Sequence, residues 1–399
     1  MKYIRFTALA LAALLCLTGC KTDNVPETAP STEPVITETP TQPPIAPDIT
    51  PISENMYSIS LPITVEETLA EDGTLIFTYS YQSIVPVLQE QDVATKLIMD
   101  FTDRIEQKRG DANLVKAVAQ SNCHAADFVP LAYEIQYDVM RFDQGVFSLY
   151  GYILNTGDAA GSNQSRVCAN YDLVTGDVLT IGSILYHIDK KADLAQLVVT
   201  ALEERDDIRL FDEYRDTVLA RFERDESVDE DFYFSANGLC FYFEPYEVAA
   251  RAYGTVTVEI PYNKLTGIIG DSFFPPERTY SDGEISLVPY DNAQLDSYEQ
   301  FVEYVAKPES EKLLLTTDNI VQDIRVYELI WSDYNQLKKN VCAVNCLSQN
   351  NAIVLEAEFD HIRPNYMIVY SINGKPHEFY LVKDAVFGQI SLVSEFIPN

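Results

Sequence analysis

Residues 231–247 read DFYFSANGLCFYFEPYE, two short aromatic runs on either side of Ala236-Asn237-Gly238. An Asn-Gly step between apolar runs is typical of a β-hairpin, because both residues suit the backbone angles of a tight turn. Aromatic side chains at alternate positions predict a sheet face packed on a core, and Pro245 predicts the end of the second strand. The tyrosine-rich strand end has a second interpretation, as part of a binding rim.

Alternating and helical patterns extend on both sides of this hairpin. Apolar alternation predicts strands at 57–65, 75–81, 131–141, 145–154, 165–173 and 255–260. Spacings of three and four predict helices at 93–105, 189–202 and 211–222, with a second short helix after Arg109-Gly110. Residues 56–275 are therefore expected to be an α+β domain of antiparallel sheets with a few packed helices.

Phe273-Phe274-Pro275-Pro276 marks a predicted boundary. Beyond it, the pattern predicts a helix near 293–306 and strands at 321–331, 352–359, 365–372 and 376–382. Asn373-Gly374 predicts a hairpin turn between the last two strands. Residues 276–399 are expected to be a second, smaller α+β module.

The first 19 residues have the pattern of a signal peptide. Lys2 and Arg5 precede an apolar stretch at 6–17, which is shorter than the roughly 20 residues that span a bilayer. The stretch ends in Leu17-Thr18-Gly19-Cys20, which resembles the lipobox of bacterial lipoproteins and implies lipidation of Cys20. The alternative is ordinary secretion with Cys20 incidental. No later segment is apolar enough to span, so we expect a lipid anchor on the outer face of the cytoplasmic membrane.

Residues 20–55 are the predicted linker, rich in Pro, Thr and Glu, with eight prolines. Proline-rich chains favour an extended conformation of about 3.1 Å per residue, so this linker reaches on the order of 100 Å. Such a spacer suits the thick wall of a Gram-positive cell.

Composition excludes some classes of protein. The chain has 28 Lys+Arg against 61 Asp+Glu and a formal net charge of -33, which argues against nucleic-acid binding. A hydrophobic content of 47% is too high for a disordered chain. Five cysteines follow Cys20, namely Cys123, Cys168, Cys240, Cys342 and Cys346. Their odd number implies a free thiol or an intermolecular bond, and we interpret most of them as small buried hydrophobic residues.

The sequence contains no recognisable catalytic motif. Its four histidines have no zinc-binding spacing, and neither a nucleophile elbow nor a phosphate-binding loop is present. We therefore expect no enzymatic activity, no cofactor and no metal site. Residues 203–231 hold 13 acidic residues and five arginines. We interpret them as solvated helix faces and a charged loop; a calcium site or a dock for a cationic partner is the alternative.

Residues 155–163, NTGDAAGSN, form a loop of small residues between two predicted strands. Glycines there permit a close approach to the backbone, so Gly157, Asp158 and Ser162 are candidate ligand contacts. The alternative is a plain hairpin connection. Together with Pro245, Tyr246 and Glu247 they make up the candidate ligand-binding set, which we expect on one exposed rim.

Several of these motifs resemble a bacterial domain of unknown function. The resemblance covers about 60–270 and rests on Asn170-Tyr171-Asp172-Leu173, Thr175-Gly176-Asp177, Leu179-Thr180, Gly238 to Phe243, Pro245-Tyr246-Glu247, Gly254, Ile260-Pro261-Tyr262 and Leu265. That domain forms the extracellular part of RsiV-type anti-sigma factors and accompanies peptidoglycan deacetylases. The chain departs from the family in lacking a cytoplasmic segment. It also has Gly157-Asp158-Ala159-Ala160 where the family often has Gly-Gly-Ala-His.

The resemblance implies binding of lysozyme, as in RsiV-type proteins. Residues 56–275 hold 36 acidic and 16 basic residues, a charge that attracts basic lysozyme. We therefore expect a non-catalytic surface lipoprotein that binds lysozyme or another extracellular macromolecule. A peptidoglycan-binding or scaffolding module and a cell-wall hydrolase are the alternatives.

Overall fold

A computed structural model describes residues 56–125, 127–157, 163–224, 231–276, 283–331, 336–372 and 375–396. All of them belong to one compact unit, residues 47–399. The predicted signal peptide, Cys20 and the linker to residue 55 lie outside the described residues, as do Asp158 and Ser162. None of the described helices is both long enough and apolar enough to cross a membrane.

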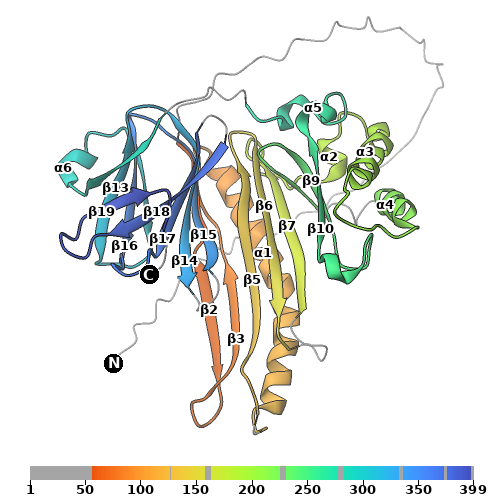
Figure 1. The fold of residues 1–399 in the computed structure, drawn as a ribbon, viewed down its shortest axis with the longest axis horizontal. Coiled ribbons are helices and arrows are strands. Elements are labelled where there is room, and N and C mark those ends of the chain that lie inside the picture. The colour runs from red at the N-terminus through yellow and green to blue at the C-terminus, as the bar shows by residue number, and fades with distance from the viewer. Residues whose placement is uncertain are drawn as a thin grey trace, which may run out of the picture. The chain divides into compact units, whose positions relative to one another are not determined.

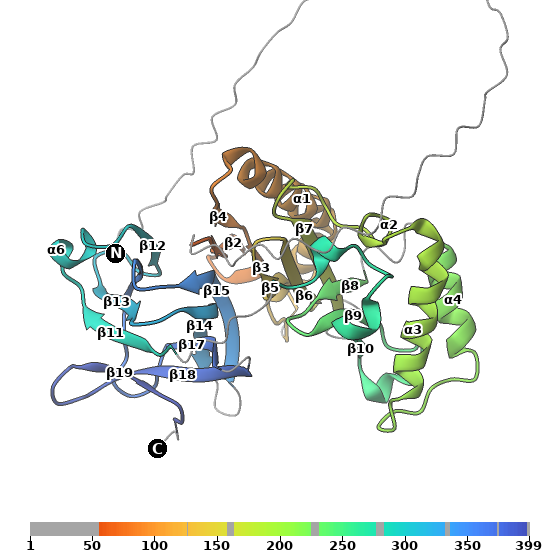
Figure 2. The ribbon, with the colours of Figure 1, turned by 90° about the horizontal axis from the view of Figure 1, so that it is seen from above.

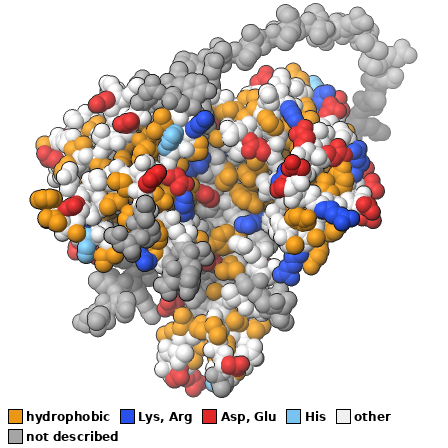
Figure 3. Space-filling view, in the orientation of Figure 1, with side chains coloured by type: hydrophobic (Ala, Val, Ile, Leu, Met, Phe, Trp, Pro, Cys, Tyr) orange, Lys and Arg blue, Asp and Glu red, His pale blue; other side chains and the backbone are white. Residues whose placement is uncertain are grey.

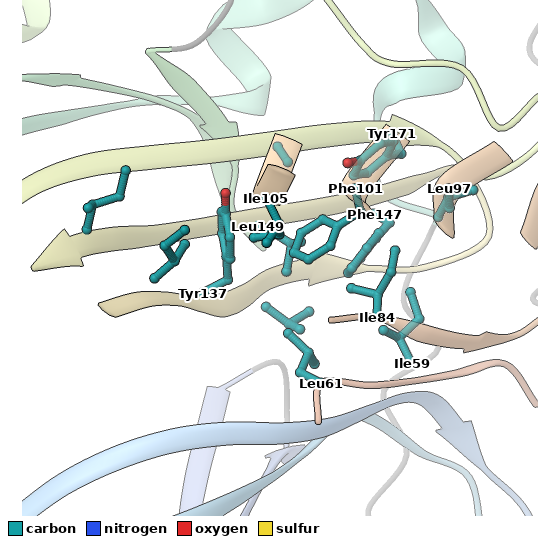
Figure 4. Close-up of a cluster of buried hydrophobic side chains, with 14 of the residues drawn as sticks. Ile59, Leu61, Ile84, Leu97, Phe101, Ile105, Tyr137, Phe147, Leu149 and Tyr171 are labelled. Atoms are coloured by element: carbon teal, nitrogen blue, oxygen red, sulfur yellow. The ribbon is translucent and has the colours of Figure 1, made fainter. Parts of the chain in front are cut away.

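A five-stranded sheet and one long helix form the first core (Figures 1 and 2). The strands, in spatial order, are β2 (Ile63–Leu69), β3 (Leu75–Gln82), β5 (Leu131–Phe142), β6 (Val146–Asn155) and β7 (Asn163–Asp172). The helix α1 (Gln91–Asn122) covers one face of this sheet. Its Leu97, Phe101 and Ile105 are buried in one cluster with Phe147 and Tyr171 (Figure 4).

A three-stranded sheet with helices on one side forms the second core. Its strands are β8 (Phe232–Phe234), β9 (Gly238–Phe243) and β10 (Val256–Pro261). The helices are α2 (Ile181–Ile184), α3 (Lys191–Glu203), α4 (Tyr214–Glu223) and α5 (Tyr262–Leu265). Leu239, Phe241 and Phe243 of β9 pack in the cluster with these helices, whereas Cys240 and Tyr242 lie in a second cluster with Cys168 and Tyr150. Alternate side chains of β9 thus pack into two different hydrophobic clusters.

Two buried side chains join the three-stranded sheet to the five-stranded sheet. The Ser148 Oγ donates a hydrogen bond to Asn170 Oδ1 (2.7 Å), and Asn170 Nδ2 donates to the carbonyl of Phe232 (2.8 Å). The backbone N–H of Phe234 donates to Ser148 Oγ (2.9 Å). Backbone groups of β8 are therefore paired with side chains of β6 and β7.

Two further sheets form the third core. One has the strand order β19 (Ile390–Val393), β18 (Lys375–Lys383), β17 (Tyr366–Ile372), β14 (Val321–Trp331), β15 (Gln336–Leu347), β1 (Ser58–Ser60) and β4 (Val85–Val87). The other has the order β11 (Ile285–Pro289), β13 (Glu311–Thr317), β16 (Asn351–Ala357) and β12 (Gln300–Val305). Since β1 and β4 precede α1 in the chain, the seven-stranded sheet combines strands from both predicted domains.

Polar contacts reinforce this junction between the N-terminal strands and the C-terminal strands. Tyr57 donates its backbone N–H to Asn345 Oδ1 (2.7 Å), and Gln82 Nε2 donates to the carbonyl of Asn340 (2.9 Å). The Tyr327 hydroxyl donates to Asp138 Oδ1 (3.0 Å). The two parts of the chain are therefore connected by a sheet and by buried hydrogen bonds, in addition to the covalent link.

The predicted α+β class is confirmed, and the differences are local. The expected helix at 293–306 is wrong: only α6 (Asn292–Leu295) is helical, and residues 300–305 form β12. Phe301, Val302 and Tyr304 suit a strand, and β12 pairs in parallel with β16. The expected break at Gly110 is also wrong, because α1 continues through it. An exposed glycine weakens a helix by only about 1 kcal/mol, which tertiary packing overcomes.

Gly151 is predicted to be irreplaceable, because a Cβ there would lie 1.9 Å from the carbonyl oxygen of Gln136. We expect Gly151→Ala to lower the free energy of unfolding by about 3 kcal/mol, measured by urea denaturation. Gly110→Ala is the matched control. It has open space around its Cβ position and lies within α1, so it should stabilise the protein by about 0.5–1 kcal/mol. Equal effects of the two changes would contradict this view.

The environment of Asp138 should make the stability of the fold depend on pH. It is half-buried, its carboxyl accepts a hydrogen bond from the Tyr327 hydroxyl, and burial raises its pKa despite this bond and the positive charge of Arg325. The folded chain therefore holds this proton to a higher pH than the unfolded chain, whose Asp pKa is about 3.9. Stability from Asp138 is thus present at low pH and is lost as pH rises through the folded value.

We expect Asp138→Asn to remove this loss. The unfolding free energy of the wild type minus that of the variant should fall as the pH rises above about 4, measured by urea denaturation at each pH. A difference that is constant, or that grows with pH, would show that Asp138 is instead stabilised as a carboxylate.

Candidate functional site

The segment after β9 is a tight turn that presents Tyr246 to solvent. The Glu247 N–H donates to the carbonyl of Glu244 (3.1 Å), and the Tyr246 N–H donates to the carbonyl of Ala249 (3.1 Å). The Glu244 N–H donates to Glu247 Oε2 (2.5 Å). Tyr246 has a φ of 74° and is 65% exposed. The turn therefore holds a bulky aromatic side chain outward in a backbone conformation that non-glycine residues rarely adopt.

Arg221 of α4 holds this turn in place. Its guanidinium forms ion pairs with Glu247 (3.0 Å) and Asp231 (3.1 Å) and donates to the carbonyl of Tyr242 (2.9 Å). It also lies 4.9 Å from the centre of the Phe243 ring, and its side chain is 12% exposed. A single nearly buried cation thus holds two carboxylates and the end of β9 together.

The turn is also bonded to the edge strand β7. Glu244 Oε1 accepts a hydrogen bond from the backbone N–H of Arg166 (2.6 Å), and the Tyr242 hydroxyl donates to the carbonyl of Arg166 (3.3 Å). Both backbone groups of Arg166 face away from β6, because antiparallel pairing leaves alternate residues directed outward. Side chains of the turn segment therefore cover the strand edge at this point.

Two hollows meet along β7, and we call them together the β7 groove. The first has a volume of about 280 Å³ and is lined by Arg104, Gln107 and Lys108 of α1, by residues 165–168 of β7, and by Tyr242 and Glu244. The second, of about 430 Å³, is lined by Asp111, Leu114, Val115, Val118, Tyr133, Ile153, Asn155, Gly157, Asn163 and Ser165. Ile153 and Ser165 line both hollows. One half of the groove is mainly apolar and the other half is charged.

Gly157 marks the apolar end of the β7 groove. Its N–H donates to Asn155 Oδ1 (2.8 Å), and a Cβ there would lie 2.6 Å from the Val115 side chain. The structure thus places Gly157 at one end of the groove and Glu244, next to Pro245 and Tyr246, at the other. Neither Pro245 nor Tyr246 lines either hollow. Asp158 and Ser162 lie outside the described residues, so their shared rim with Tyr246 stays a prediction.

Sequence reasoning missed the contribution of α1 to the groove. Leu114, Val115 and Val118 belong to the predicted second short helix, and of the three only Val115 is buried. Leu114 is 68% exposed and lines the groove. The signal that could have shown this was the length of α1. Because the helix continues through Gly110, the apolar residues Leu114, Val115 and Val118 extend along it beyond the core.

The other sequence-based candidates occupy ordinary surroundings. No group of His, Cys, Asp or Glu among the described residues has the arrangement of a metal site. Cys168, Cys240, Cys342 and Cys346 are buried, and no disulfide joins the cysteines that the structure describes. Burial raises the pKa of Cys240 and of Cys342 to about 12, so both thiols are protonated at neutral pH. Within the acidic run, Glu203 pairs with Arg215 and Glu204 with Lys264 at the surface.

Residues 184–263, which include β8, β9, β10 and the Tyr246 turn, match the model of a family described as "Protein of unknown function (DUF3298)". A domain of unknown function is thus present where the sequence resemblance is densest. A solved DUF3298 family member from Bacteroides fragilis is similar, with 16% identity and a TM-score of 0.38 over 54% of this chain and 94% of that one. A DUF3298 family protein from Pseudomonas aeruginosa has 16% identity and a TM-score of 0.35 over 54% and 97% of the two chains. No curated protein matches the chain.

Arg221→Ala should destabilise the protein by about 3 kcal/mol, since it leaves Glu247 and Asp231 without their shared, nearly buried cation. Arg215→Ala on the same helix is the control. Its side chain is 49% exposed and pairs only at the surface, so the loss should stay below about 1 kcal/mol. Urea denaturation measures both values, and a loss at Arg221 no greater than at Arg215 would contradict the role given to this contact.

Proposed function

We propose that this protein is a surface lipoprotein whose head binds lysozyme through the Tyr246 turn and the β7 groove. The proposal joins three observations: the lipobox-like sequence at Cys20, the resemblance to the lysozyme-binding domain of RsiV-type proteins, and the geometry of the turn. In this proposal the head is a binding module and performs no catalysis. Its ligand contacts are Gly157, Asp158, Ser162, Pro245, Tyr246 and Glu247.

The conformation of Tyr246 carries the proposal. A non-glycine residue with a φ of 74° costs about 1–3 kcal/mol, which persists only where the surroundings impose it. Here Glu247, Glu244 and Arg221 impose it, and the result is an aromatic side chain exposed at 65%. Backbone strain that only exposes a large aromatic side chain does not stabilise the fold. It supports a role in binding, where tyrosine is among the most frequent hot-spot residues.

Charge supports the choice of a basic partner. With 36 acidic and 16 basic residues, segment 56–275 attracts a cationic protein such as lysozyme over a distance set by the ionic strength. Two of the acids nearest Tyr246 are already engaged, Glu247 by Arg221 and Glu244 by the backbone of β7. Charge therefore contributes mainly to the association rate, and affinity depends on the aromatic rim and the groove.

The proposed location fits this partner. A lipid at Cys20 and an extended linker to residue 55 would hold the head outside the cytoplasmic membrane, in the wall that lysozyme attacks. Bound there, the head would act as a decoy that removes free enzyme from the wall.

An extended wall polymer is the second candidate ligand. The two hollows of the β7 groove adjoin at Ser165 and Ile153, which line both, and such a row of hollows suits a chain-like ligand. This alternative predicts retention of residues 47–399 on purified peptidoglycan. Retention that is lost on substitution of Leu114 in the groove would favour it over the lysozyme decoy.

Calorimetry of residues 47–399 with hen lysozyme, at low and at physiological salt, tests the main proposal. We expect 1:1 binding that survives physiological salt and that weakens at least about tenfold in Tyr246→Ala. Tyr186→Ala is the matched control, because Tyr186 is 56% exposed and lines neither hollow, and it should bind as the wild type does. Binding that disappears at physiological salt, or equal effects of the two variants, would overturn the proposal.

A further inference from the structure

The turn between β18 and β19 carries two apolar side chains far out into solvent. Phe387 is 85% and Val386 is 79% exposed, the highest values among the large hydrophobic side chains in the described part of the chain. This turn lies at the outer side of the C-terminal sheets, on the side opposite α3 and α4 (Figures 1 and 2). Figure 3 shows hydrophobic side chains spread over the same side of the molecule.

The turn is well ordered by its own hydrogen bonds. Asp384 Oδ1 accepts from the N–H groups of Val386 (2.9 Å) and Phe387 (2.6 Å). The Asp384 N–H donates to the carbonyl of Gln389 (2.8 Å), and the Gly388 N–H donates to the carbonyl of Asp384 (2.9 Å). Four N–H groups are therefore bonded within the turn, and the two apolar side chains are exposed.

A second turn at the same end of the sheet repeats the arrangement. Asp360 Oδ1 accepts from the N–H of Ile362 (2.8 Å), and Ile362 is 69% exposed. The strand register places the two turns together: Met367 pairs with Tyr380, and Lys383 pairs with Ile390. The segment before β17 and the turn after β18 thus leave the sheet from neighbouring strands. We call Ile362, Val386 and Phe387 the apolar tip.

Amphipathic side chains and paired charges surround the base of the apolar tip. Trp331 Nε1 donates to the carbonyl of Pro364 (2.8 Å), and the Arg363 guanidinium lies 5.9 Å from the centre of the Trp331 ring. Lys383 pairs with Glu311 (2.6 Å), and Lys307 pairs with Glu358 at the same end. Tryptophan, arginine and lysine beneath apolar tips are the residues that occupy the headgroup level of a bilayer.

We propose that the apolar tip inserts into the interface of a lipid bilayer. Side chains that protrude from two separate turns suit a fluid acyl region better than a protein surface, which would need a matching pocket for each. Insertion is also eased because Asp384 and Asp360 already bond the N–H groups of the three tip residues, which would otherwise lose their water partners. The tip would be a second membrane attachment beside the lipid expected at Cys20, and weak single attachments become stable when two act together.

This inference concerns residues 360–389 and is independent of lysozyme binding at the Tyr246 turn. Residues 276–399 hold 19 acidic and nine basic residues, so a zwitterionic bilayer is the appropriate probe. The test uses residues 47–399, the compact unit, without the lipid, and phosphatidylcholine vesicles at physiological salt.

Trp331 provides the readout, because it is the one tryptophan of the chain and it lies at the base of the tip. We expect co-sedimentation with the vesicles, a blue shift of the Trp331 emission, and quenching by brominated lipid. The double variant Val386→Ser/Phe387→Ser should weaken partitioning at least tenfold and abolish the quenching, with an unchanged unfolding midpoint since both side chains are exposed.

Val174→Ser is the matched control. Val174 is 72% exposed, and its N–H also bonds to a turn aspartate, Asp172 (2.7 Å), but it lies between β7 and α2. It should partition as the wild type does. Absence of vesicle binding by the wild type, or equal losses in the double variant and Val174→Ser, would overturn the inference. So would a wild-type dimer in light scattering that the double variant dissolves, because the tip would then be a self-association surface.

Discussion

Ser148 and Asn170 form hydrogen bonds with the backbone of β8 that a neighbouring strand would otherwise form. Their buried amide and hydroxyl bond the carbonyl of Phe232 and the N–H of Phe234, so two backbone groups on the edge of the three-stranded sheet are paired where it meets the five-stranded sheet. A buried polar network of this kind is favourable only when every member is satisfied. Because it is satisfied here, β9 can bury residues on both faces, and its end projects beside β7. The Tyr246 turn and the β7 groove both depend on that placement.

Much of the fold could be predicted from local patterns. The hairpin at 231–243 has an Asn-Gly turn and alternating aromatics, and both strands formed as expected. Two of the failures concern residues whose neighbours are distant in sequence. Residues 300–305 have helical spacing, yet pairing with β16 makes them a strand. Strand β15 was missed although it lies inside its sheet, because its last eight residues are all buried and so lack the alternation that reveals a strand.

The candidate site was predictable only in part, for a similar reason. The residues of the turn could be named from the sequence, because a proline and a tyrosine follow a buried strand. Arg221, Arg166 and Leu114 could not, because each acts through a partner on another element: Glu247, Glu244 and the hollow beside β7. Sequence reasoning thus finds side chains that face solvent at a strand end more readily than the contacts that hold them in place.

The pairing of β1 with β15 also has a kinetic consequence. Ser58 lies opposite Val344, and Tyr57 is bonded to Asn345, 288 positions later in the chain. Contacts between residues so far apart in sequence are slow to form, because closing the long loop between them costs conformational entropy before the contacts stabilise the chain. A chain that emerges from a membrane amino end first cannot complete this sheet until almost all of it has crossed. With the lipid proposed at Cys20, the N-terminal segment would be attached to the membrane before the head has finished folding.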